Sequence, residues 1–302
     1  MSAIVPSPSI ATDSEPPYGV HIFQLASANF YIPLDQTPIH LATTSNVLEY
    51  REEIFTMVSS ARNAQYPELT LHPPYHEWVL RMASLEWLMH IHERCDMVID
   101  TLWLAINIFN RYIAMVHPPP SDYDTIGLSA LCIAGKYEEA RHPKYRNLVR
   151  LVDGDIVSRA ALLRAEHGIL TALKFDFGRY VSPSLCIWHI AIIDEYWMEP
   201  RCVAKVIVES TITELDFLSC PVFKLGAAAL FLGLTMCGGH WKAIYVERTG
   251  LSENDLRPLA NRMLRMFRHD DYQRTFVFRK YSSSGHSHVS HSIRTWALIH
   301  TL

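Results

Sequence analysis

The stretch that decides the fold of this chain is TIGLSALCIAGKYEEA, Thr125 to Ala140. Residues 125–135 carry no charge, and their apolar side chains fall on every side of a helical wheel. A helix that is apolar all round is buried on all sides. Because the stretch is too short to span a bilayer, it predicts the central helix of a soluble helical domain. Its charged end, Lys136-Tyr137-Glu138-Glu139, must emerge from the core, and we look for function there.

The composition excludes several classes of protein. A length of 302 residues suggests two domains of ordinary size. A net charge of −4, with basic residues spread along the chain, argues against binding nucleic acid through a general basic field. The six cysteines show no C-x-x-C spacing, which favours reduced thiols over a disulfide framework. With no signal-peptide pattern and no long uncharged apolar segment, we expect a soluble intracellular protein without a membrane partner.

Helical periodicity on both sides of this stretch predicts an all-α fold, and no segment alternates convincingly with the period of a strand. A first set of helices is expected at about 78–95, 100–116, 125–140, from 143, and 155–174, with Asp155 as a cap of the last. A second set is expected at about 182–197, 200–218, 222–237, 240–248 and 252–268. An additional helix begins near Asn46 and places Tyr50, Ile54 and Met57 on one face.

An internal repeat relates the two sets. Aligning Gly127 with Gly226 superposes GLSALCIAG on GAAALFLGL, small residues over small and large over large. Each segment is the third helix of its set, so we expect two five-helix domains built alike around a buried third helix. The predicted division is a flexible arm (1–45), the N-terminal helix with the first domain (46–178), the second domain (179–272) and a polar, irregular tail (273–302).

The sequence contains no recognisable enzyme motif: the nucleophile elbow, the phosphate-binding loops and the H-E-x-x-H zinc signature are all missing. His286, His288 and His291 are candidates for a weak metal site, although a solvated tail is the preferred interpretation. We therefore expect no catalytic residue, no cofactor and no metal.

Glu166 lies inside the apolar arc of the fifth helix. A carboxylate there costs several kcal/mol if it is buried unpaired. It therefore needs a basic partner or a position at the edge of a binding surface, and Lys136, at the end of the third helix, is the natural candidate. The alternative is that Lys136 merely favours the negative end of its own helix while Glu166 reaches water.

Three strings together resemble the cyclin box in order and spacing: TLWLAINIFNRYIA, SALCIAGKYEE and LLRAEHGILTALKFD. The second set of helices resembles the C-terminal cyclin fold, and FRKYSSS is similar to the ending of mitotic, B- or A-type cyclins. The resemblance covers roughly residues 47–290. It implies two tandem five-helix cyclin-box domains plus an N-terminal helix, found in the nucleus and cytoplasm.

The resemblance also implies a non-enzymatic subunit that binds and activates the catalytic subunit of a cyclin-dependent kinase, with G2/M as the expected transition. In the family, the residues matching Lys136 and Glu166 hydrogen-bond to the kinase near its αC helix. The implied apolar kinase contacts are Ile133, Tyr137, Leu170 and Phe175, with Tyr50, Ile54 and Met57 on the N-terminal helix.

The chain departs from the family in the groove that docks substrates and inhibitors, whose matching residues are Leu80, Arg81, Ala83, Ser84 and Trp87. Ala83 and Ser84 replace two large aliphatic residues, so we expect hydrophobic docking peptides to bind weakly. The acid that usually pairs with the matching Arg81 is replaced by Asn110, which accepts a hydrogen bond but does not neutralise the charge.

Two alternative functions remain open at this point. One is a degenerate cyclin that binds a kinase without activating it, as the altered groove and Asn110 suggest. The other is a scaffold or transcription factor that uses the same double fold to bind another protein or DNA. The negative net charge counts against the DNA-binding version.

Overall fold

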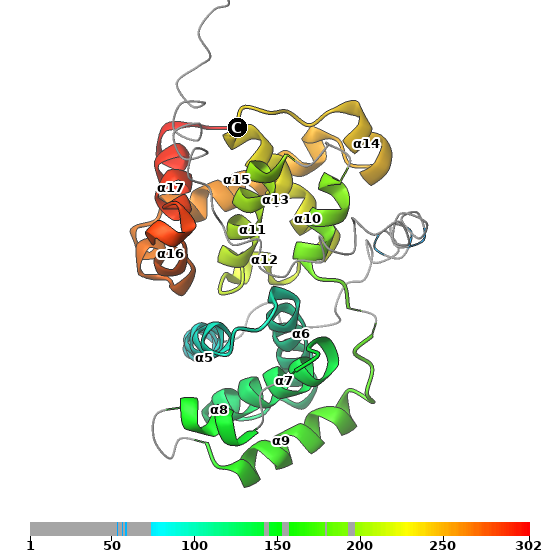
Figure 1. Cartoon of the computed structure of the whole chain (residues 1–302), viewed down its shortest axis with the longest axis vertical. Helices are drawn as coiled ribbons and strands as arrows, with labels where there is room; N and C mark the ends of the chain where they lie inside the picture. The colour runs from blue at the N-terminus through cyan, green and yellow to red at the C-terminus, as the bar shows by residue number, and fades with distance from the viewer. Residues whose placement is uncertain are drawn as a thin grey trace, which may run out of the picture.

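The structure, a computed structural model, describes residues 53, 56, 58, 74–141, 145–152, 157–178, 180–192 and 197–302. Within these ranges every regular element is a helix, which confirms the all-α prediction. The helices form two lobes stacked along the long axis of the molecule, with α5–α9 in one lobe and α10–α17 in the other (Figure 1).

The first domain is built around α7, as the sequence predicts. Its helices are α5 (Tyr75–Arg94), α6 (Ile99–Val116), α7 (Tyr123–Glu138), α8 (Tyr145–Leu151) and α9 (Arg159–Ala172), with a 3₁₀ turn η2 (Pro120–Asp122) before α7. Residues 126–135 of α7 are all buried. Helices α5, α6 and α9 pack around α7, so the apolar side chains on each side of α7 contact another helix.

The second domain repeats this plan around α13. Its helices are α10 (Pro183–Ala191), α11 (Met198–Ser210), α12 (Leu215–Leu218), α13 (Val222–Met236), α14 (Ala243–Thr249) and α15 (Glu253–Arg268). Helices α10, α11 and α15 pack around α13, just as α5, α6 and α9 pack around α7. The tandem arrangement predicted from the internal repeat is therefore confirmed, with the one-turn helix α12 inserted before α13.

The two aligned glycines have different roles in these cores. A Cβ at position 226 would lie 2.9 Å from both the Cys186 Cβ and the Pro183 carbonyl oxygen, so α13 approaches α10 more closely than any side chain permits. A Cβ at position 127 would meet only the side chains of Leu88 and Phe109, at an ordinary 3.9 Å. The repeat preserves the glycine position, but only the second domain requires glycine there.

The predicted cap of the fifth helix is wrong. Helix α9 begins at Arg159, and the Ser158 side chain accepts a hydrogen bond from the Ala161 amide at 3.1 Å. Ser158 therefore satisfies an amide of the first turn that has no partner within the helix, which is the role assigned to Asp155 from the sequence.

The expected irregular tail is helical. It contains the 3₁₀ turns η3 (Asp270–Arg274) and η4 (Ser284–His286) and the helices α16 (Phe276–Tyr281) and α17 (Val289–Ile299). Val289, Ile293 and Trp296 recur with helical spacing and are buried, and α17 packs on α15 and α11. The intervening Ser and His residues dilute this apolar pattern in the sequence, and one of them, Ser290, is itself buried.

Helix α16 joins the two domains. The Phe276 amide donates to the Glu86 Oε1 of α5 at 3.2 Å, and the Phe276 ring packs edge-on against His90 with centroids 4.3 Å apart. At the other end of α16, Lys280 Nζ and Tyr281 Oη donate to the buried Glu209 of α11 at 3.2 and 2.8 Å. Burial opposes the charged form of Glu209, but Lys280 and the Tyr281 hydrogen bond hold its pKa below the usual range.

Candidate functional site: a partner-binding surface on the first domain

The charged end of α7 meets α9 as the sequence predicts. Lys136 Nζ donates a hydrogen bond to Glu166 Oε1, with 40% of the lysine side chain and 12% of the glutamate side chain exposed. The carboxylate in the apolar arc of α9 thus has its basic partner, and the interpretation in which each group acts alone does not describe the structure. An ion pair this open to solvent contributes about 1 kcal/mol or less to stability.

The end of α9 brings two predicted contact residues together. The Phe175 amide donates to the Leu170 carbonyl at 3.2 Å, and the Lys174 amide to the Thr171 carbonyl at 3.3 Å. These two bonds form a Schellman motif, in which the residues at the positions of Leu170 and Phe175 commonly make an apolar contact. Lys174 and Phe175 both adopt the left-handed conformation, with φ of 53° and 58°. The motif holds Phe175 with 70% of its surface exposed.

The segment after Phe175 is fixed from two sides. Arg111 of α6 donates to the Asp176 carbonyl at 2.7 Å, and its guanidinium lies 3.8 Å from the Asp176 carboxylate. A Cβ at position 178 would lie 2.8 Å from the Tyr137 hydroxyl, so the Tyr137 side chain lies directly over this segment. Tyr137 is 56% exposed. Two exposed aromatic residues therefore flank the Lys136–Glu166 pair on a rigid support.

The other predicted contacts are placed differently. Ile133 is only 5% exposed, so it supports the surface from the core instead of presenting its side chain. Tyr50, Ile54 and Met57 lie outside the described residues. Glu139, which sequence reasoning left without a role, accepts hydrogen bonds from the Val98 amide at 2.8 Å and the Thr101 hydroxyl at 2.7 Å. Its carboxylate therefore caps the N-terminus of α6.

The predicted docking groove lies along α5. Leu80 is 46% exposed, Ala83 is exposed and Trp87 is partly buried. Ser84 points inward, where its hydroxyl donates to the Asp124 carboxylate of α7 at 2.6 Å. Leu80 and Ala83 therefore reach the surface of α5 while Ser84 does not, and weak docking of hydrophobic peptides stays a prediction.

Arg81 lies behind this surface, 4% exposed. Its guanidinium donates twice to the Asn110 Oδ1, at 2.7 and 3.2 Å, and lies 4.7 Å from the ring centroid of Trp78. Its remaining terminal nitrogen is buried with no hydrogen-bond partner among the described residues. Burial lowers the Arg81 pKa to about 9. The Asn110 contact was foreseen from the sequence, whereas the Trp78 contact was not.

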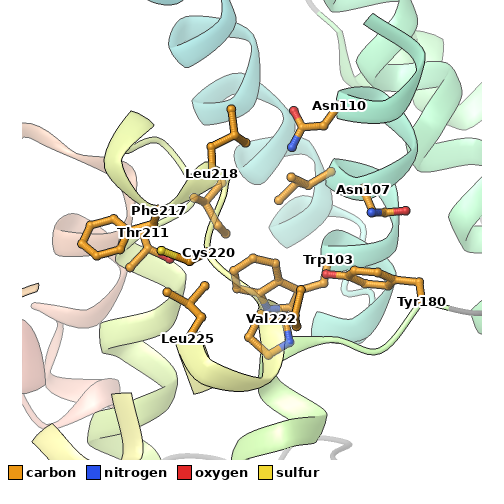
Figure 2. A pocket seen from close by; sticks show the side chains of 13 residues that line it. Trp103, Asn107, Asn110, Tyr180, Thr211, Phe217, Leu218, Cys220, Val222 and Leu225 are labelled. Carbon is orange, nitrogen blue, oxygen red and sulfur yellow. The ribbon is translucent and has the colours of Figure 1, made fainter. Parts of the chain in front are cut away.

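A cavity of about 80 Å³ lies at the junction of the domains, where α6 faces the α12 region (Figure 2). Asn107 lines it, and the Asn107 Oδ1 is buried without a partner among the described residues. This space suits ordered water better than a substrate, because small-molecule sites are usually several hundred Å³. The lining residues are Trp103, Ile106, Asn107, Asn110, Tyr180, Pro183, Thr211, Ile212, Phe217, Leu218, Cys220, Val222 and Leu225.

Other kinds of site find no support in the part of the chain that the structure describes. No group of three His, Cys, Asp or Glu side chains there is arranged to hold a metal ion. His286 and His291 each pack on an aromatic ring, of Tyr281 and Phe278 respectively. None of the described helices is long and apolar enough to cross a bilayer. The cysteines are free thiols, and burial raises the pKa of Cys132, inside α7, to about 12.

Comparison with known families identifies the fold. The family model of the cyclin N-terminal domain matches residues 53–178, and that of the cyclin C-terminal domain matches residues 174–294. The chain belongs to the cyclin family. Cyclins are regulatory subunits.

Similar curated proteins include mitotic cyclins of fungi. G2/mitotic-specific cyclin-3 of Saccharomyces cerevisiae is 30% identical over 83% of this chain and 59% of its own length. Cyclin-4 of Candida albicans is 29% identical over 82% of this chain and 51% of its own length, and cdc13 of Schizosaccharomyces pombe is 30% identical over 83% and 52%. This cyclin therefore spans between half and three fifths of the length of these relatives.

Solved structures share the fold at low sequence identity. A viral cyclin from herpesvirus saimiri superposes with a TM-score of 0.55 and 17% identity, over 73% of this cyclin and 96% of the viral one. A chain in the crystal structure of the yeast RNA Pol II CTD kinase CTDK-1 complex gives a TM-score of 0.57 and 14% identity, over 74% of both chains. These likenesses support the double cyclin fold.

Proposed function

We propose that this cyclin binds the catalytic subunit of a cyclin-dependent protein kinase and activates it, and that it acts at the G2/M transition. The observation that carries the proposal is the Lys136–Glu166 pair, flanked by the exposed Tyr137 and Phe175 on a cyclin fold. The similarity to G2/mitotic-specific cyclins supports the choice of transition. On the resemblance alone we further propose that it occurs in the nucleus and cytoplasm.

The mechanism is a shift of population. A protein kinase transfers phosphate rapidly only when the ion pair between its β3 Lys and its αC Glu is assembled and its activation loop is ordered. A partner that binds the αC-in arrangement more tightly favours it by no more than that difference in affinity. Tyr137 and Phe175 supply apolar area for this binding, while Lys136 and Glu166 fix the register. This cyclin contributes no catalytic group to phosphoryl transfer.

The first prediction tests this function with purified chain, a mitotic cyclin-dependent kinase subunit and a histone substrate. The wild-type chain should form a complex and raise the phosphorylation rate. The double variant Lys136→Ala, Glu166→Ala should bind at least tenfold more weakly, because its apolar contacts remain but their register is lost. Its circular dichroism spectrum should match that of the wild type, since the pair contributes little to stability.

Two outcomes would contradict this proposal in different ways. If the wild-type chain forms no complex, the kinase-binding function is excluded. If it forms a complex without activity, the protein is a degenerate cyclin that holds a kinase inactive. The Arg81–Asn110 contact, in which an amide replaces the usual acid, is the specific feature that favours this second candidate.

A further inference from the structure

The connection between α6 and α7 contains three consecutive prolines, Pro118 to Pro120, and η2 begins at the last of them. Pro119 has φ of −61° and ψ of 140°, which are the dihedral angles of a polyproline II helix. A proline ring fixes its own φ and disfavours a helical conformation of the residue before it, so Pro118 and Pro119 are both held extended. The segment therefore has this conformation before any partner binds.

Two of the three prolines have ordinary structural roles. Pro118 directly follows the C-cap of α6, a position where proline is common because it cannot continue a helix. Pro120 is the first residue of η2, where a fixed φ and a missing amide proton are favourable. Pro119 has neither role, and its side chain is exposed. The middle proline, which makes the run continuous, is the one for which the fold gives no reason.

The prolines adjoin the exposed apolar end of α6. Met115 is 59% exposed and Val116 is 44% exposed, and the left-handed His117 that follows them ends the helix with φ of 50°. The Asp122 amide donates to the Pro119 carbonyl at 2.9 Å, so η2 holds the far end of the segment. A single exposed apolar residue is ordinary on a protein surface. Here, however, exposed apolar side chains and an exposed proline ring share a short backbone that is fixed at both ends.

Acidic side chains lie beyond the prolines. Asp122 is exposed, and Asp124 is partly exposed in the first turn of α7. Glu77, also partly exposed, lies on α5, and α5 contacts η2. Because opposite charges speed association and orient the partner, a complementary surface should carry cations beside the place where it meets the prolines.

Domains that recognise polyproline II bind it in grooves lined with aromatic side chains. A stiff, solvated ligand suits such a groove, because little entropy is lost when it binds. We propose that residues 115–120 form a docking site for a protein domain of this kind, with an aromatic groove for Met115 and the prolines and a basic rim facing Asp122. This site presents a ligand, unlike the groove along α5, which would receive one.

The proposed site and the surface around Lys136 lie at opposite ends of α7. Tyr123 begins the helix and Lys136 is in its last turn. At 1.5 Å per residue the two ends are about 20 Å apart. A domain bound to the prolines can therefore be present together with a kinase, and it would tether this cyclin to a further protein. The inference does not depend on the proposed kinase binding.

The second prediction tests this site by surface plasmon resonance. The full chain is immobilised and exposed to three purified domains that read polyproline II, an SH3, a WW and an EVH1 domain, of which at least one should bind. Pro119→Ala should raise the Kd of that domain about fivefold or more, because the groove loses a ring and the segment loses stiffness. Asp122→Asn should slow association about twofold at low ionic strength and less at high salt.

The matched control is Pro258→Ala, because Pro258 is exposed but lies inside the helix α15. This variant should leave the Kd within about twofold. Met115→Ser keeps all three prolines and should raise the Kd about threefold. If Pro119→Ala melts early by circular dichroism, Met115→Ser decides the matter, and an unchanged Kd for it overturns the proposal.

Three other results would also overturn it. They are binding by none of the three domains, a folded Pro119→Ala chain that binds like the wild type, and a Pro258→Ala chain that loses as much affinity as Pro119→Ala. Pro119→Ala should still bind the kinase subunit as the wild type does, since the surface around Lys136 is unchanged. A wild-type chain that binds one of the domains but no kinase excludes the proposed function alone.

Discussion

Arg81 is a buried cation of the first domain whose hydrogen-bond partner is the amide of Asn110, not a carboxylate. Asn110 accepts two hydrogen bonds but leaves the charge uncompensated, and burial lowers the Arg81 pKa to about 9. The third prediction is that Asn110→Asp raises the free energy of unfolding by about 2 kcal/mol, because a buried cation gains a charged, hydrogen-bonded partner. Urea unfolding at neutral pH, monitored by tryptophan fluorescence, measures the change.

The chain offers a matched control for this exchange. Asn107 lies one turn earlier on the same helix and is 6% exposed, and its Oδ1 has no hydrogen-bond partner among the described residues. Asn107→Asp should lower the free energy of unfolding, since it buries a carboxylate without a cation. If both variants are destabilised, the Arg81 charge is already compensated in the wild type and this account of the site is wrong.

At the scale of single residues, some hydrogen-bonded pairs of side chains can be predicted from the sequence, whereas the further side chains that pack around them cannot. The Lys136–Glu166 contact follows from a carboxylate placed in an otherwise apolar helix face, and the Arg81–Asn110 contact follows from the resemblance to the cyclin box. The Trp78 ring over Arg81 and the Glu139 cap on α6 follow from neither. They depend on the angle at which helices cross, which the pattern of one helix does not contain.

At the scale of elements, the end of α9 holds two non-glycine residues in the left-handed conformation. Lys174 occupies the position of the Schellman motif that glycine usually fills. The fourth prediction is that Lys174→Gly raises the free energy of unfolding by about 0.5–1 kcal/mol, because relief of the left-handed strain exceeds the extra entropy of glycine in the unfolded chain. Differential scanning calorimetry should show a Tm higher by about 1–2 °C.

Lys174→Ala separates strain from the loss of the lysine side chain, because alanine keeps the unfavourable conformation. It should melt close to the wild type. Since the motif is made by backbone hydrogen bonds, neither variant should change how Phe175 is presented. A Lys174→Gly chain that melts at or below the wild-type temperature would show that the conformation is not strained.

Elements with a dense apolar pattern are predictable from this sequence, and elements with a diluted one are not. Helices α7 and α13 are apolar all round, so their burial and their central positions both follow. Helix α17 has one buried face set among Ser and His residues, and it was expected as irregular tail. The helical structure of α17 depends on packing against α15 and α11, which its own sequence pattern does not reveal.

At the scale of the molecule, two buried histidines limit stability in acid. Burial lowers the pKa of His92, and that of His189, from 6.5 to about 4. The unfolded chain takes up these protons near pH 6.5, whereas the folded chain takes them up only near pH 4. The fifth prediction is that the contribution of these two histidines to stability is constant above neutrality and falls between about pH 6.5 and 4, by up to about 3 kcal/mol for each histidine.

Urea unfolding across this range measures the loss. His189 Nε2 has no hydrogen-bond partner among the described residues, so His189→Phe removes one titrating group without breaking a bond to the ring nitrogen. The variant should lose about half as much stability between pH 6.5 and 4 as the wild type. The same replacement at the exposed His76 is the control. Equal slopes for wild type and His189→Phe would contradict the assignment.

The Glu86–Phe276 contact also bears on the order in which the two domains form and join during synthesis. The two residues are 190 positions apart, and a ribosome delivers them in that order. The first domain has its own core and can fold early, as N-terminal domains generally do during synthesis. Glu86 and His90 therefore lack their contacts with Phe276 of α16 until nearly all of the second domain has been translated. A chain interrupted before residue 276 would therefore carry the proposed contact residues Lys136, Glu166 and Phe175 but would lack the contact that joins the two domains.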